Sequence, residues 1–152
     1  MPQGLNIIFT MQLAASYYQQ PQLAEKILGP QINAEQIFQE AEVMARLQAG
    51  QLDASSAYKT QPAAMGLPYL PLPSKINLGD AALEPQYRKA TVTLNGKPLH
   101  PWPLVFYATV LNDASEPALA KRFVDWLSGA EARAKFSSYH YDDPGGAATL
   151  IP

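Results

Sequence analysis

Apolar residues recur at helical spacing in five segments, which are predicted to be helices: residues 5–20, 22–28, 34–49, 115–127 and 130–139. The first segment is apolar nearly all round its circumference, a pattern typical of a buried helix, and Pro21 ends it. The pair Gly29-Pro30 ends the second segment, and Gly50 is placed to end the third. Ser115 is expected to cap the fourth helix.

Strands are predicted where apolar residues alternate or run continuously over a short length: residues 52–58, 69–72, 91–94 and 104–111. Asn95-Gly96 follows the third strand and indicates a type I′ hairpin turn. The fourth strand is an unbroken apolar run, which favours a central position in a sheet. Residues 60–66 are predicted to form a turn or a short helix. Strands that alternate with helices indicate an α/β protein, with a mixed β-sheet flanked by helices.

The composition excludes several classes of function but assigns none. The 152 residues are 47% hydrophobic and 16% charged, with a formal net charge of -2, so the chain is not expected to be a disordered tail. No basic block is present, which argues against nucleic-acid binding. The absence of cysteine excludes disulfides, thiolate zinc sites and cysteine nucleophiles. No apolar run is long enough to span a bilayer, and no cofactor motif is found.

One segment near the carboxyl end could be interpreted as a catalytic or metal site. His140 lies beside Asp142 and Asp143, which is the residue chemistry of an acid-base pair or a metal centre. The segment is terminal, and the other histidine, His100, lies between prolines in an expected loop. No Ser-His-Asp order, phosphate loop or HExxH motif accompanies them. A solvated tail is therefore favoured, and a free-standing hydrolase that uses His140 is the alternative.

Two other features favour an anion. Residues 2–5 begin a helix with no charged side chain near it, and helix starts present N–H groups and a positive dipole end to anions. Further along, a helix, a glycine stop and a small-residue strand bring Tyr58 to the end of that strand, where α/β sheets collect ligands. The patterns alone favour Tyr58 as a packing residue at the strand end and Glu40 as a solvated helix carboxylate.

These segments resemble a known family in one consistent order over residues 2–140. The similar stretches are Pro2-Gln3-Gly4-Leu5, Glu40-Ala41-Glu42-Val43 through Tyr58-Lys59-Thr60, Leu72-Pro73-Ser74-Lys75-Ile76-Asn77-Leu78, and the helix Leu119-Ala120-Lys121-Arg122-Phe123-Val124-Asp125-Trp126-Leu127. Together they resemble the second half of the periplasmic molybdate/tungstate-binding proteins, the solute receptors of ABC importers.

The resemblance implies a lobe of the type II periplasmic-binding-protein architecture. Residues 1–111 would form the second lobe of a receptor, and residues 112–152 would return to the first lobe. About half of such a receptor, including its signal peptide, would precede this sequence, and Met1 stands where the family often has an aspartate. The implied protein is not an enzyme. It would be periplasmic or extracellular and membrane-anchored, with a membrane permease as its partner.

The resemblance also implies three ligand contacts. The backbone N–H of Gln3, the carboxylate of Glu40 and the hydroxyl of Tyr58 would meet a transported molybdate or tungstate ion. It further implies that a helix begins at Glu40 and that residues 37–39 are extended, against the pattern-based helix over 34–49. A receptor for sulfate or another small solute is the alternative within the class. A lone lobe would expose apolar surface and is expected to self-associate.

Overall fold

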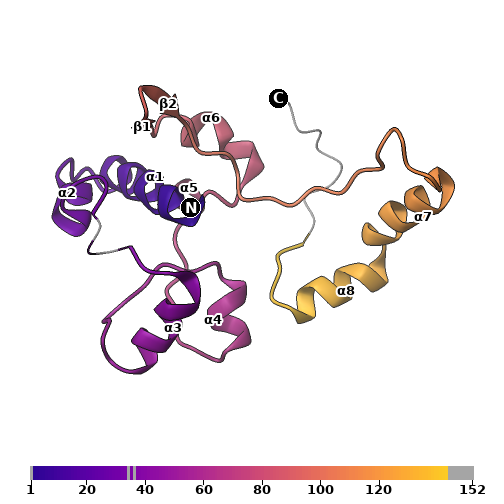
Figure 1. Ribbon diagram of the computed structural model, residues 1–152, viewed down its shortest axis with the longest axis horizontal. Coiled ribbons are helices and arrows are strands. Elements are labelled where there is room, and N and C mark those ends of the chain that lie inside the picture. Colours follow the sequence, from indigo (N-terminus) through magenta and orange to yellow (C-terminus); the bar gives the residue numbers. More distant parts are fainter. Residues whose placement is uncertain (1, 34, 36, 144–152) are drawn as a thin grey trace. The chain divides into compact units, whose positions relative to one another are not determined.

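The computed structural model of the protein describes residues 2–33, 35 and 37–143 (Figure 1). The chain divides into two compact units, each made of two separate stretches of sequence. The first unit comprises Met1–Ser56 and Leu72–Val105, and the second comprises Ala57–Pro71 and Phe106–Pro152. The chain therefore passes from one unit to the other after residues 56, 71 and 105.

Short helices dominate both units. In the first unit the elements are α1 (Pro2–Tyr17), α2 (Leu23–Leu28), α3 (Glu40–Gln48), α5 (Ser74–Asn77), the 3-10 helix η2 (Ala81–Leu83), α6 (Glu84–Tyr87), β1 (Val92–Leu94) and β2 (Lys97–Leu99). In the second unit they are α4 (Thr60–Ala64), α7 (Pro117–Leu127) and α8 (Ala130–Ser138).

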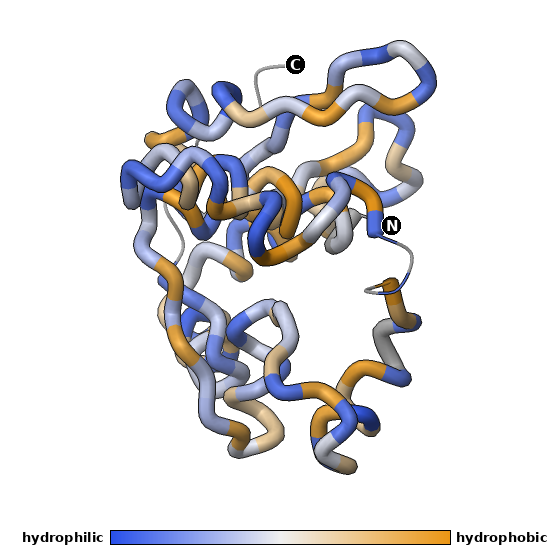
Figure 2. Tube along the Cα trace, turned by 90° about the vertical axis from the view of Figure 1, so that its left-hand side faces the viewer, coloured by the Kyte–Doolittle hydropathy of each residue, from blue (hydrophilic) through white to orange (hydrophobic). Residues whose placement is uncertain are grey.

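The core of the first unit forms where α1 meets residues that follow much later in the chain. Figure 2 shows hydrophobic residues recurring along the helix that begins at the N mark, and α1 has no acidic or basic residue in its terminal turns. Phe9 and Leu13, one helical turn apart, are buried in this core. The buried residues of the core are Phe9, Leu13, Ala14, Ile76, Leu78, Tyr87, Ala90 and Val92. Burying each large side chain contributes about 1.5–3 kcal/mol, so this cluster is the main stabilising feature of the unit.

Besides the packing of Val92 in the core, a glutamine of α1 forms hydrogen bonds to the residue before the β-hairpin. Asn95 and Gly96 have φ values of 51° and 74°, the left-handed pair that a type I′ turn requires, so the predicted hairpin is confirmed. The Gln12 side chain donates from Nε2 to the Thr91 carbonyl at 2.9 Å, and Thr91 N–H donates to Gln12 Oε1 at 2.8 Å. Gln12 thus satisfies both backbone groups of the residue that precedes β1.

The predicted helices are largely confirmed, with one correction. α1, α2, α7 and α8 lie where the pattern placed helices, and α4 confirms the short helix expected over residues 60–66. The continuous helix over 34–49 is wrong, because Gln39 is extended at φ -70° and ψ 142° and α3 begins at Glu40. Two acidic residues, Glu40 and Glu42, favour a helix start there. Residues 34 and 36 lie outside the described part of the chain.

The end of α3 is as predicted, whereas the start of α7 is not. Gly50 has φ 68°, so it confirms the expected left-handed residue after α3. Ser115 does not cap α7. The capping position is Glu116, which makes no side-chain cap, and Pro117 occupies the first turn, where its missing N–H leaves no donor unpaired.

Of the four predicted strands, the one over 91–94 is confirmed as β1 and the other three are wrong. Residues 52–58, 69–72 and 104–111 form no strand, and the described residues contain one sheet, of two antiparallel strands. The mixed sheet flanked by helices is thus shown only to this extent. A strand forms only when its backbone finds a neighbouring strand, and hydropathy does not report whether one is present. Phe106, in the supposed central strand, is 87% exposed.

Candidate functional site

Gln3 lies in the first turn of α1, as the resemblance requires for an anion-binding N–H group. The helix starts at Pro2 and has 16 residues, with no acidic residue in its first turn. The first N–H groups of a helix have no carbonyl partner within the helix, so they remain available to an acceptor. Gln3 thus carries one of the first N–H groups of α1, and its contact with an anion stays a prediction, while Met1 lies outside the described residues.

Glu40 is the first residue of α3, where the resemblance placed it. The carbonyl of Gln39, immediately before it, accepts hydrogen bonds from the N–H groups of Glu42 at 2.9 Å and Val43 at 3.1 Å. The neighbouring carboxylate, Glu42, is bound by Arg46 at 2.5 Å, and the Arg46 guanidinium lies 4.8 Å from the Phe38 ring centroid. Of the two acidic residues at this helix start, Glu42 is thus committed to an ion pair.

Tyr58 lies in the second unit, two residues before α4 begins at Thr60. Its carbonyl accepts a hydrogen bond from Gln61 N–H at 2.9 Å, which fixes the backbone at the entrance to that helix. The residue is 38% exposed, so part of its ring is accessible. Lys59 follows it, and the Lys59 ammonium forms an ion pair with Asp142. The tyrosine is therefore held on a fixed backbone beside a lysine.

The three predicted ligand residues do not belong to one unit. Gln3 and Glu40 belong to the first unit and Tyr58 to the second, and each is described within its own unit. Their convergence on one ligand stays a prediction. A hollow of about 630 Å³ in the first unit involves none of them; its lining includes Gln12, Ser16, Gln19, Pro21 and Lys89.

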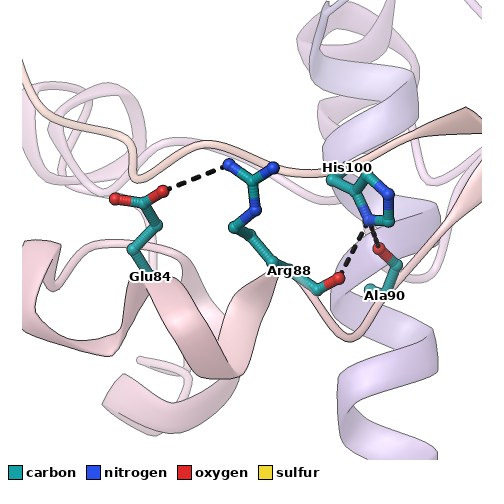
Figure 3. A network of polar contacts seen from close by, with 4 residues as sticks. All are labelled: Glu84, Arg88, Ala90 and His100. Carbon is teal, nitrogen blue, oxygen red and sulfur yellow. Dashed lines mark hydrogen bonds and ion pairs between the residues drawn. The ribbon is translucent and has the colours of Figure 1, made fainter. Parts of the chain in front are cut away.

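His100 has a structural position. Its Nδ1 lies 2.9 Å from the Arg88 carbonyl and 3.1 Å from the Ala90 carbonyl, so this nitrogen donates its proton to backbone acceptors (Figure 3). Arg88 also pairs with Glu84 at 3.4 Å and lies 5.5 Å from the Trp102 ring centroid. The histidine thereby links the chain after β2 to the end of α6.

The acid-base interpretation of the carboxyl end receives no support. His140 has φ 65°, and Asp142 is engaged by Lys59. Among residues 2–33, 35 and 37–143, no group of three or more histidine, aspartate and glutamate side chains could hold a metal ion.

Sequence reasoning missed the Lys59–Asp142 ion pair and the Gln12–Thr91 hydrogen bonds. The partners are 83 and 79 residues apart, and neither pair leaves a local pattern in the sequence.

Within the same described ranges, no helix is long and apolar enough to cross a membrane.

Comparison with known proteins identifies the family of this chain. Residues 1–142 match the family described as bacterial extracellular solute-binding protein. The chain is 29% identical over 162 residues to the molybdate/tungstate-binding protein WtpA of Pyrococcus abyssi, which covers 93% of this chain and 47% of that relative. The WtpA protein of Thermococcus kodakarensis is 30% identical over 162 residues, covering 93% and 46%. The chain thus spans about half the length of these relatives, and the resemblance drawn from its motifs is confirmed.

Proposed function

The chain belongs to the bacterial extracellular solute-binding protein family, and from this membership we propose that it binds a tetrahedral oxyanion, molybdate or tungstate, as one lobe of a two-lobe receptor. One observation carries the proposal: similarity along 93% of the chain to receptors named for molybdate and tungstate, at about half of their length. The family fits a periplasmic-binding-protein-like α/β fold and is a solute-binding family, which supports a protein that is not an enzyme.

The chemistry of the candidate residues agrees with this proposal. A dianion stripped of water needs several fixed N–H and O–H donors, which need not carry a full charge. The start of α1 supplies backbone N–H groups at Gln3, and Tyr58 supplies a hydroxyl on a backbone fixed by α4. Glu40 would act differently, because a carboxylate approaches the metal centre of the oxyanion rather than its oxygens. We propose all three as ligand contacts of the two-lobe receptor.

The proposed cellular role follows from the family. An extracellular solute-binding protein works with an ABC importer, so we propose a membrane permease as the partner and a periplasmic or membrane-anchored extracellular location. We propose no cofactor, because the oxyanion is the transported ligand. The isolated chain supplies only part of the donor set, and we propose that it binds molybdate weakly and self-associates, as light scattering and calorimetry on residues 1–152 would measure.

The test is a calorimetric titration of the two-lobe receptor with molybdate, tungstate and sulfate. Tyr58→Phe removes one hydroxyl donor to a charged ligand, which costs on the order of 1.5–3 kcal/mol, so molybdate affinity should fall roughly ten- to a hundredfold. Tyr69→Phe is the matched control, because Tyr69 is similarly exposed at 46% and lies in the same unit. Equal affinities of both variants would reject Tyr58 as a ligand contact, and sulfate binding in preference to molybdate and tungstate would reject the molybdate/tungstate assignment in favour of a sulfate receptor.

A further inference from the structure

The carboxyl-terminal segment returns to the residue that follows Tyr58. The Asp142 carboxylate accepts a hydrogen bond from the Lys59 ammonium and forms an ion pair with it, although 83 residues separate them in the sequence. Aromatic contacts hold the same segment: the Tyr141 ring lies edge-on to Phe106, with centroids 5.9 Å apart, and to Phe136, with centroids 5.8 Å apart. All these residues belong to the second unit. The carboxylate is thus brought to Lys59 by a defined set of contacts.

The backbone that carries the ammonium is fixed, whereas the ion pair is exchangeable. The Tyr58 carbonyl accepts from Gln61 N–H at 2.9 Å, and the Lys59 carbonyl accepts from Ala63 N–H at 3.2 Å. The Lys59 side chain is 41% exposed and that of Asp142 is 88% exposed. Ion pairs exposed to water are weak, because water and salt screen them. A second anion that reaches Lys59 can therefore replace the carboxylate.

We propose that Lys59 contacts the oxyanion and that Asp142 competes with the oxyanion for the Lys59 ammonium. This inference rests on the function proposed above, in which Tyr58 donates to the same ion. A carboxylate and an oxyanion present the same chemistry to an ammonium group, namely negatively charged oxygens that accept its hydrogen bonds. Asp142 occupies Lys59 when no anion is bound, and it lowers the apparent affinity of the site.

Competition predicts a gain of affinity, which distinguishes it from a structural role. In the two-lobe receptor, Asp142→Asn should tighten molybdate binding about two- to fivefold, the range expected for loss of one exposed ion pair. Lys59→Met should weaken binding about tenfold or more, because it removes a charged donor, and Lys59→Arg should retain most of the affinity. Asp143→Asn is the matched control, with the same charge change one residue away. Weaker binding by Asp142→Asn would overturn the proposal, since it would mean that the pair only supports the fold.

A second measurement needs no ligand. Acetylation of the 152-residue chain, followed by mass spectrometry, should label Lys59 about two- to fivefold faster in Asp142→Asn than in Asp143→Asn, with Lys97 of the other unit as the internal reference. An unchanged rate at Lys59 would overturn the ion pair and the proposal with it. A Tyr58→Phe effect without the Asp142→Asn gain would overturn the competition alone, and a Lys59 response without any molybdate binding would overturn the proposed function.

Discussion

Removing the Tyr87 hydroxyl should destabilise the first unit measurably. Tyr87 is fully buried; its hydroxyl donates to the Ser74 carbonyl at 2.5 Å and accepts from Asp80 N–H at 3.2 Å. Tyr87→Phe keeps the ring but breaks both hydrogen bonds, which contribute about 0.5–1.5 kcal/mol each. The expected loss is therefore about 1–3 kcal/mol in the free energy of unfolding. Tyr18→Phe, on an exposed residue of the same unit, should change it by no more than about 0.5 kcal/mol.

The assay must report on this unit alone, because the chain has two. The sequence contains two tryptophans, and Trp102 belongs to the first unit while Trp126 belongs to the second. In a Trp126→Phe background, urea unfolding followed by tryptophan fluorescence reports on the unit that contains Tyr87. With a slope of about 1 kcal/mol per molar urea, the midpoint of Tyr87→Phe should fall by about 1 M or more.

The same substitution should change the response to alkaline pH. Burial, together with the nearby Asp80 carboxylate, raises the pKa of the Tyr87 phenol, against a smaller opposing effect of the Asp80 N–H hydrogen bond. Its pKa in the unfolded chain is about 10. Above that pH the unfolded state releases the proton while the folded state keeps it, so stability falls as the pH approaches the folded pKa. The stability difference between wild type and Tyr87→Phe should therefore be constant below about pH 10 and shrink above it.

Equal urea midpoints for Tyr87→Phe and Tyr18→Phe at pH 7 would contradict the role of the hydroxyl. A stability difference that grows above pH 10 would contradict the stated direction of the pKa shift.

Three further predictions concern other contacts. Gln12→Ala should lower the free energy of unfolding by about 1–3 kcal/mol, because two backbone groups of the hairpin lose their partner, whereas Gln48→Ala at the end of α3 should change little in the same urea titration. Gly96→Ala should lower the melting temperature by an amount equivalent to about 1 kcal/mol or more, since φ 74° strains any side chain, whereas Gly4→Ala in α1 should be neutral or stabilising. Glu40→Gln should raise the affinity for sulfate relative to molybdate and tungstate in the two-lobe receptor, because sulfur cannot expand its coordination as the metals can. Identical selectivity by calorimetry would return Glu40 to a solvated carboxylate.

Local chemistry made some of the fold predictable from sequence. Asn95-Gly96 specified the hairpin because the backbone of a type I′ turn is set within those two residues. The apolar run over 104–111 gave a wrong strand prediction. Hydropathy indicates only that burial of these residues would be favourable, whereas a strand also needs a neighbouring strand, and Phe106 is 87% exposed. The role of Gln12 could not be foreseen, because its partner Thr91 lies 79 residues away.

The candidate site was less accessible to physical reasoning than the fold. An uncharged helix start before Leu5 indicated an anion in general. The pattern reached Tyr58 only through a strand over 52–58 that does not form, and it did not single out Glu40. The resemblance gave both residues a ligand role and also corrected the start of α3 to Glu40, which the pattern had placed inside a longer helix. Lys59 was passed over because its importance depends on where Asp142 folds back, and a sequence gives no measure of that.

The long sequence separation within the core of the first unit also determines how long α1 stays uncovered during synthesis. α1 is made before the residues that cover it, since Phe9 packs in a cluster with Tyr87 and Val92, which leave the ribosome about 80 residues later. At roughly 5–20 residues per second, the apolar residues of α1 wait about 4 to 17 seconds for that covering. A nascent chain halted before Tyr87 would present Phe9 and Leu13 uncovered, as a binding segment for chaperones that take up apolar helices.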